Sequence, residues 1–129
     1  MLRLSNNTLT GTIPTEVGRM EKLTGFSLAV NDMRSSMPTE LGLLTALTSL
    51  SFFDNAAISG SIVSELANLS TLKVLRLFGT QLSGSVPSSL CVRLERAEMD
   101  CDGRVQCDCC TAPGTDFVAG SPCETAATP

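Results

Sequence analysis

The sequence contains no histidine, tryptophan or tyrosine among its 129 residues. Without histidine, Ser-His-Asp and Cys-His nucleophilic catalysis and most zinc-dependent hydrolysis are excluded. The glycine-rich phosphate-binding motifs G-x-x-x-x-G-K-[ST] and G-x-G-x-x-G are also absent. Any enzyme chemistry would rest on carboxylates, lysine or thiols alone. We therefore expect a protein that is not an enzyme and that holds no cofactor and no metal.

Long apolar runs and an excess of basic residues are missing as well. No apolar run approaches the length of a membrane-spanning helix, and no secretory signal opens the chain. Residues 1–91 balance six acids with six bases, whereas residues 92–129 carry seven acids and three bases and hence the whole net charge of −4. This charge pattern excludes a basic stripe for nucleic acid and gives no support for binding to anionic lipid.

What the sequence does contain is an internal repeat with periods of 24 and 25 residues, marked by opening leucines at Leu23, Leu47 and Leu72. Four copies follow the template L-x-x-L-x-L-x-x-N-x-L-x-G-x-I-P. They begin "LRLSNNTLTGTIP", "LTGFSLAVNDMRSSMP", "LTSLSFFDNAAISGSI" and "LKVLRLFGTQLSGSVP". The first copy lacks its opening L-x-x, and Thr80 stands where the fourth would have asparagine.

Each part of the template has a physical reason. Its x-L-x-L stretch has period two, which predicts a strand with leucines facing inward. Asparagine tolerates unusual backbone angles and bonds nearby backbone groups, so Asn7, Asn31 and Asn55 are expected to stack as a polar ladder. The segments "TEVGRMEKL", "TELGLLTAL" and "SELANLSTL" have apolar residues at nearly helical spacing, which suits short helical turns on the opposite side.

On these motifs the chain resembles the leucine-rich repeat family, and "LTGTIPTEVGRMEKL" and "LSGSVPSSLC" resemble its plant-type class of receptor ectodomains and secreted inhibitors. The resemblance implies an α/β solenoid: a right-handed superhelix with a short parallel sheet on its concave face and short helical or irregular segments on its convex face. Residues 1–91 would form four repeats, the first one truncated. Stacking then buries a core that no single copy can bury alone.

All six cysteines lie near the C-terminal end, and three readings compete for them: a metal site, a redox site or a disulfide staple. Zinc usually takes C-x-x-C pairs, and a redox C-x-x-C usually accompanies a βαβ unit; the spacing and surroundings here favour neither. An even number in a terminal cap favours disulfides, without deciding among fifteen pairings. The residues concerned are Cys91, Cys101, Cys107, Cys109, Cys110 and Cys123.

We therefore expect residues 92–123 to form a degenerate fifth strand and a disulfide-rich cap, and residues 124–129 to form a frayed tail. This cap resembles cysteine-rich ends of leucine-rich repeat proteins from algal and diatom-type lineages. The vicinal Cys109 and Cys110 are expected to bond different partners. Disulfides indicate an oxidising compartment, so a secreted protein or the extracellular side of a membrane protein is expected. The N-x-[ST] sequons at Asn6 and Asn68 agree with this as candidate glycosylation sites.

In this fold, ligands usually meet the x positions around the strand leucines. The register places Phe53 and Phe78 side by side on the concave face, roughly 5 Å apart. Two neighbouring aromatic rings are the best binding anchor available, unless the cap or a neighbouring domain covers them. The other candidate contact residues are Arg76, Asp54, Ser51 and Ser27.

Two functions remain open. The favoured one is a non-catalytic recognition module that binds a protein, peptide or glycan, and the alternative is a purely structural capped end of a longer solenoid. The first copy begins mid-template, and its apolar residues Leu2, Leu4, Leu9 and Ile13 would leave an end of the core open to water. We therefore expect further repeats or other domains upstream.

Overall fold

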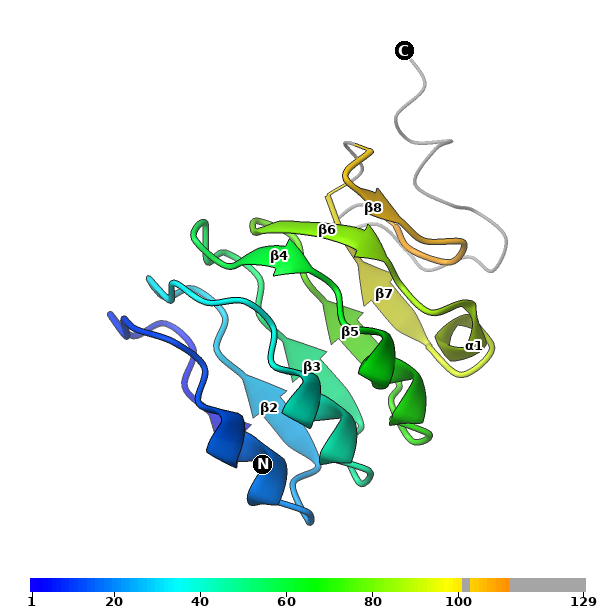
Figure 1. Cartoon of the computed structure of the whole chain (residues 1–129), viewed down its shortest axis with the longest axis horizontal. Helices are drawn as coiled ribbons and strands as arrows, with labels where there is room; N and C mark the ends of the chain where they lie inside the picture. Colours follow the sequence, from blue (N-terminus) through cyan, green and yellow to red (C-terminus); the bar gives the residue numbers. More distant parts are fainter. Residues whose placement is uncertain (101–102, 112–129) are drawn as a thin grey trace.

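A computed structural model describes residues 1–100 and 103–111 as a coil of stacked repeats (Figure 1). The first strand of every repeat joins one five-stranded parallel sheet with the order β1-β2-β3-β5-β7. All strands run in the same direction because each turn of the coil brings the chain back to the same side. These strands are β1 (Leu2–Arg3), β2 (Gly25–Ser27), β3 (Ser49–Ser51), β5 (Val74–Arg76) and β7 (Arg96–Glu98).

A second parallel sheet, which the repeat template does not predict, lies on another side of the coil. Its strand order is β4-β6-β8. It is formed largely by the serine- and glycine-rich segments that follow the x-L-x-L stretches of the template. Successive repeats hydrogen-bond here as well, for example where Ser59 pairs with Gln81. The strands are β4 (Ser59–Ser61), β6 (Gln81–Ser85) and β8 (Val105–Gln106).

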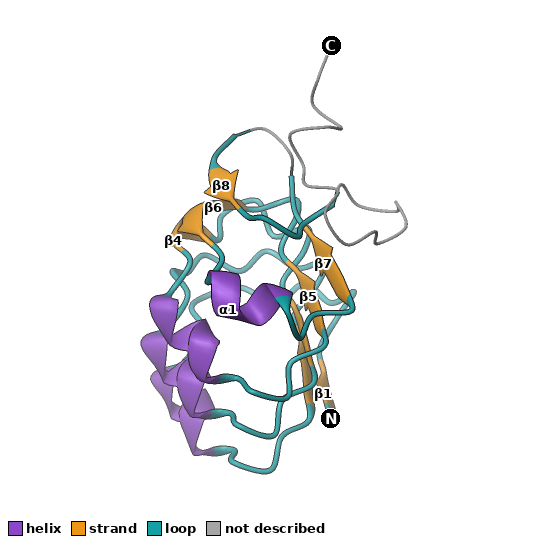
Figure 2. Ribbon diagram, turned by 90° about the vertical axis from the view of Figure 1, so that its right-hand side faces the viewer, coloured by secondary structure: helices purple, strands orange, loops and turns teal. Residues whose placement is uncertain are grey.

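The remaining side of the coil carries short helices, stacked opposite the five-stranded sheet (Figure 2). Three of these helices are 3₁₀ helices, and they lie in the segments for which helical turns were predicted. Gly42 allows two of them to lie close together, since a Cβ atom there would meet the Glu65 carbonyl oxygen at 2.7 Å. The helices are η1 (Thr15–Arg19), η2 (Thr39–Leu43), η3 (Ser64–Asn68) and α1 (Ser88–Cys91).

Leucines of the template fill the space between these three sides. Leu47, Leu50, Leu72 and Leu75 are fully buried, which confirms the predicted inward direction of the x-L-x-L stretch. Each such side chain contributes roughly 1.5–3 kcal/mol through its burial. Phe52 occupies one leucine position and packs edge-on against Phe26 of the preceding repeat, with ring centroids 5.6 Å apart.

The predicted asparagine ladder is present and connects successive repeats. Asn31 Nδ2 donates to the Leu4 carbonyl of the preceding repeat at 2.8 Å and to the Leu28 carbonyl of its own repeat at 2.9 Å. Asn55 repeats this pattern with Leu28 and Phe52. These bonds satisfy carbonyl groups that the bend at the end of each strand would otherwise bury unpaired.

The architecture confirms the predicted leucine-rich-repeat-like solenoid, with parallel strands and short helical turns. In the part of the chain that the structure describes, no helix is long and apolar enough to cross a membrane.

Candidate ligand-binding face

The concave face is the outer surface of the five-stranded sheet, and its side chains lie in columns that cross the strands. The register found between strands is the one the repeat predicts, with Leu50 beside Phe26 on one side and Leu75 on the other. Residues flanking these leucines point to the opposite side. One such column runs through Arg3, Ser27, Ser51, Arg76 and Glu98.

Phe53 and Phe78 form a stacked aromatic pair on this face. Each lies two residues beyond the end of its strand, β3 or β5, and the ring centroids are 4.7 Å apart with an angle of 16° between planes. Both are half-buried, whereas the adjacent Phe52 is fully buried. Because Phe52 and Phe53 point to opposite sides of the sheet, the sequence "FFD" supplies one ring to the core and one to the surface.

The residue after this column adopts a left-handed backbone in all four repeats. The φ angles are 58° for Asn6, 58° for Val30, 57° for Asp54 and 68° for Gly79. Asparagine, aspartate and glycine accept this conformation readily, but a β-branched valine does not. Position 79 also requires glycine for a steric reason, because the Asp54 carboxylate occupies the space that a Cβ atom would need. Asp54 directly follows Phe53 in the chain, and it is exposed.

Two carboxylates from the C-terminal segment complete the face, and neither is among the predicted contact residues. Glu98 of β7 lies beside Arg76, with Oε1 2.8 Å from Arg76 Nε, and its other oxygen lies 3.7 Å from Arg96 Nη1. Asp100 Oδ2 accepts the Gly79 N–H at 2.8 Å. Continuing the columns from β5 into the predicted fifth strand would have found them, since Glu98 aligns with Arg76.

The candidate contact residues differ in how far they reach the solvent. The Arg76 side chain is 38% exposed although its charge is paired, and Ser27 is half-buried. Ser51 departs from expectation because it is only 5% exposed. It is a small side chain in the middle of its column, directly beside the much longer Arg76. A ligand on this face would meet Arg76 before it met Ser51.

Disulfide bonds fix the segment behind this face. Cys91 at the end of α1 bonds Cys109, and Cys107 bonds Cys110. Disulfides in the cap are thus confirmed for these four residues, and the vicinal cysteines do bond different partners. Cys101, Cys123 and the predicted tail at 124–129 lie outside the described residues. After the second disulfide, the Thr111 N–H donates to the Ala97 carbonyl of β7 at 2.8 Å.

Comparison with known proteins agrees with this geometry. A family model described as Leucine Rich Repeat matches residues 1–20 and 71–92. This chain is a leucine-rich repeat protein. No curated protein matched it in a sequence search.

Solved structures similar to this leucine-rich repeat chain are plant receptor ectodomains. The plant peptide hormone receptor RGFR1 in complex with RGF2 is 34% identical, with a TM-score of 0.70 over 80% of this chain. The leucine-rich repeat ectodomain of GASSHO1/SCHENGEN3 from Arabidopsis thaliana, in complex with CASPARIAN STRIP INTEGRITY FACTOR 2, is 36% identical, with a TM-score of 0.69 over 79%. That of the receptor kinase SOBIR1 from the same plant is 26% identical, with a TM-score of 0.71 over 83%.

The chain covers only part of these proteins: 16% of RGFR1, 12% of GASSHO1/SCHENGEN3 and 56% of SOBIR1. It therefore corresponds to a few repeats of a solenoid that is longer in each of them.

The leucine-rich repeat core is open at its N-terminal end, as expected. A cavity of about 400 Å³ lies there, lined mainly by apolar side chains that include Leu2, Leu4, Leu9 and Phe26. Leu2 and Leu4 are half-buried and Leu9 is exposed, but Ile13 is buried and does not share the predicted exposure.

Both sequon asparagines of this leucine-rich repeat chain are accessible. Asn68 is the last residue of η3 on the helical side, and Asn6 lies at the end of the first strand segment; each is exposed. Their glycosylation remains a prediction.

Proposed function

We propose that this chain is a non-catalytic recognition module that binds a protein or peptide on its concave face. Two observations on other proteins support this: a similar ectodomain belongs to a peptide hormone receptor, and another was solved in complex with CASPARIAN STRIP INTEGRITY FACTOR 2. The sequence allows a glycan as well, but the similar structures favour a protein or peptide.

The observation that carries the proposal is the half-exposed stack of Phe53 and Phe78 in the middle of the sheet. Aromatic side chains bury much area at low entropic cost, and they dominate the energetics of many interfaces. The Glu98 carboxylate lies 2.8 Å from Arg76 Nε, so the charge of the guanidinium is paired on this face. Exposed Asp54 offers acceptor oxygens on the other side. Arg76, Asp54 and Ser27 are therefore proposed as contacts at the rim.

The test is a selection of binders from a phage-displayed random peptide library, followed by affinity measurements on variants. Phe53→Ala and Phe78→Ala are each expected to weaken binding by about 1–3 kcal/mol. Leu43→Ala is the matched control, because it removes an apolar side chain that is 59% exposed on the helical side. Peptides that bind the phenylalanine variants as tightly as the native chain, or that lose affinity with Leu43→Ala instead, would contradict the proposal.

We further propose that the chain works in the extracellular space, in a secreted protein or on the outer side of a membrane protein. The paired cysteines support this, since disulfides persist in oxidising compartments. Expression through a eukaryotic secretory pathway is expected to add a glycan at Asn68, and removal of glycans by an amidase is expected to convert that asparagine to aspartate. An unmodified Asn68 in the secreted product would count against this location.

A second candidate function is that of a capped structural end, and the open N-terminal core favours it. The apolar cavity would be covered if a further repeat preceded β1 and paired with its free edge. The ligand site would then lie in that additional part. Peptide affinity measured for this chain and for a form extended upstream separates the two: equal affinities support binding here, and binding by the extended form alone supports the structural role.

A further inference from the structure

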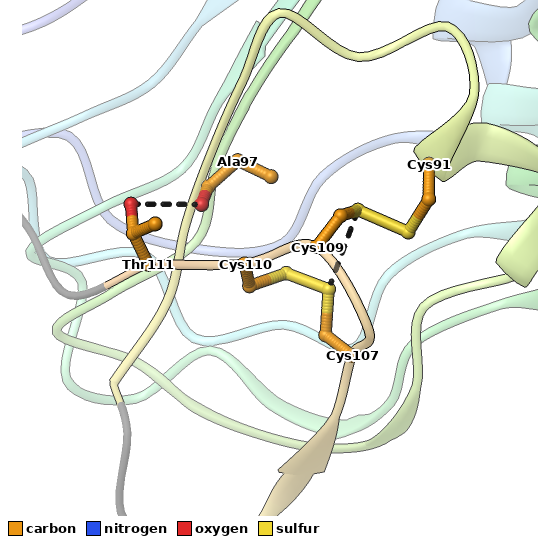
Figure 3. The surroundings of a disulfide bond; sticks show 6 residues. All are labelled: Cys91, Ala97, Cys107, Cys109, Cys110 and Thr111. Carbon is orange, nitrogen blue, oxygen red and sulfur yellow. Dashed lines mark hydrogen bonds between the residues drawn. A yellow bond between two sulfur atoms is a disulfide. The ribbon is translucent and has the colours of Figure 1, made fainter. Parts of the chain in front are cut away.

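Two disulfides of the cap lie side by side, and their sulfur atoms nearly touch (Figure 3). Cys107 Sγ lies 3.9 Å from Cys109 Sγ, although these atoms belong to different disulfides. The sulfurs of Cys91, Cys107 and Cys109 all lie within 4.8 Å of one another. A thiolate formed on Cys107 would therefore be next to the disulfide that holds α1.

The four sulfur-bearing residues are not equally accessible. Cys91 and Cys107 are half-buried, whereas Cys109 and Cys110 are buried. Exchange begins with the attack of an outside thiolate on a disulfide sulfur, so access decides which sulfur reacts first. In the Cys107–Cys110 bond, the reachable sulfur is that of Cys107, and Cys110 is the leaving group.

We propose that the cap contains a disulfide relay, in which reduction of Cys107–Cys110 by an external dithiol moves the second crosslink away from Cys91. In the first step the dithiol attacks Cys107 Sγ, and its second thiol resolves the mixed disulfide. The dithiol is oxidised to a disulfide by two electrons, and Cys107 and Cys110 become thiols with the two protons it releases.

The second step is an internal exchange without net oxidation. The Cys107 thiolate attacks Cys109 Sγ, a Cys107–Cys109 bond forms, and the Cys91–Cys109 bond breaks. The electron pair leaves with Cys91, which takes up the proton that Cys107 released. The products are one disulfide between Cys107 and Cys109 and free thiols on Cys91 and Cys110.

Cys110 is unsuited to the same attack. It is the chain neighbour of Cys109, and consecutive Cα atoms are about 3.8 Å apart, below the usual range of about 4.4–6.8 Å for a disulfide. The relay therefore runs through Cys107.

The exchange would release one contact of the cap and leave another in place. It frees the end of α1, where Cys91 is the last residue. Two bonds that do not involve sulfur join Thr111 to β7 and to the residue after it: the Thr111 N–H donates to the Ala97 carbonyl at 2.8 Å, and the Met99 N–H donates to the Thr111 carbonyl at 3.0 Å. The relay thus detaches the last helix from the cap while the cap remains on the sheet.

A pair of variants tests the relay without any reductant. Cys110→Ser leaves Cys107 as a free thiol beside the intact second disulfide, and Cys107→Ser leaves the buried Cys110 instead. Both variants are treated in the folded state with N-ethylmaleimide near neutral pH. They are then quenched in acid and digested with trypsin and an Asp-N protease. The sequence then places Cys91, Cys107 and the Cys109–Cys110 pair on three different peptides, apart from Cys101 and Cys123.

In Cys110→Ser we expect the Cys107 peptide to be linked to the Cys109 peptide, with Cys91 alkylated. In Cys107→Ser we expect Cys91 to stay linked to Cys109, so that alkylation of Cys91 is at least severalfold lower. Equal protection of Cys91 in both variants would overturn the relay. It would be overturned equally by Cys110→Ser chains in which Cys91 and Cys109 remain joined.

The native sequence gives an independent measurement if either variant fails to fold. Substoichiometric dithiothreitol, followed by the same trapping and digestion, yields chains that have lost one disulfide. The relay predicts that alkylated Cys91 and Cys110 appear together in these chains. Alkylated Cys107 and Cys110, with Cys91 still joined to Cys109, would show simple reduction and refute it.

Discussion

Replacement of Asn55 by alanine should cost more stability than any exposed polar substitution in this chain. Asn55 is fully buried, so water cannot replace its hydrogen bonds when the side chain is removed. Its Nδ2 donates to the Leu28 carbonyl at 2.9 Å and to the Phe52 carbonyl at 3.0 Å, and its Oδ1 accepts the Met33 N–H at 3.1 Å. Asn55→Ala removes all three, together with a longer bond from Nδ2 to the Phe53 carbonyl at 3.3 Å, and leaves these backbone groups in the core without those partners.

The magnitude follows from these bonds. A typical protein hydrogen bond contributes about 0.5–1.5 kcal/mol, and a buried group left unpaired costs about 1–3 kcal/mol. Three bonds lost together, with partial relaxation of the loop, give an expected loss of about 3–5 kcal/mol. Such a loss is a large share of the total stability of a domain of this size, which is about 5–15 kcal/mol.

Two variants serve as matched controls. Asn7→Ala removes the equivalent side chain where it is exposed and donates only within its own repeat, so it should cost within about 0.5 kcal/mol. Asn55→Thr imitates Thr80, whose hydroxyl donates to Leu77 of its own repeat at 2.7 Å. It should lie between the other two, because threonine keeps the local bond and loses the bond to the preceding repeat.

Urea unfolding followed by far-ultraviolet circular dichroism measures the three differences in free energy. Hydrogen exchange of the Met33 and Leu28 amides reports whether the damage lies between the second and third repeats. If Asn55→Ala is no more destabilising than Asn7→Ala, the ladder is not what joins the repeats, and its assignment here is wrong.

Three further results are expected from the same unfolding assay. Leu50→Ala should cost roughly 2–5 kcal/mol as a buried cavity, while the half-exposed Phe53→Ala should cost less, about 1–2 kcal/mol including its stacking; equal losses would mean that the Phe53 ring belongs to the core. Gly42→Ala should lose about 1–3 kcal/mol, because its Cβ would meet the Glu65 backbone, and an unchanged midpoint would show that the helices can move apart. Val30→Gly should gain roughly 1 kcal/mol by relieving a valine at φ 58°, since Val30 is 39% exposed and little packing is lost; a destabilised variant would mean that the side chain matters more than the strain.

The repeat was sufficient to predict the register of the concave sheet. Leucines at fixed spacing fix which residues face inward, because a shift of one residue would move the whole set to the solvent side. The pairing of Leu50 with Phe26 and Leu75, and the side-by-side placement of Phe53 and Phe78, follow from that spacing alone.

The second sheet was not predicted, and its residues explain why. β4 reads Ser-Gly-Ser and is exposed throughout, so it lacks both the alternation and the β-branched residues by which strands are recognised. It forms because the stacked leucine strands already hold neighbouring repeats at the distance of a strand pair. Its backbone groups then bond across repeats, and the Ser83 hydroxyl adds one side-chain bond to the Gly60 carbonyl at 3.4 Å. The pairing of the cysteines could not be predicted either, because spacing alone does not determine disulfide connectivity.

The cap continues the geometry of the repeats, but different residues make its contacts. In earlier repeats the N–H of the left-handed residue donates to a backbone carbonyl of the next repeat, as Asp54 does to Phe78 at 3.0 Å. The corresponding Gly79 N–H donates instead to the Asp100 side chain, at the aligned position. Glu98 likewise pairs with Arg76, whereas β2 and β3 carry serines in the same column. Carboxylates thus make contacts that backbone groups make in earlier repeats, while the Cys91–Cys109 disulfide joins the segment to the last helix in addition to its buried apolar residues Ala97 and Met99. A template of leucines alone does not indicate these residues. The cap keeps the positions and the bonds of a repeat, but other residue types form them.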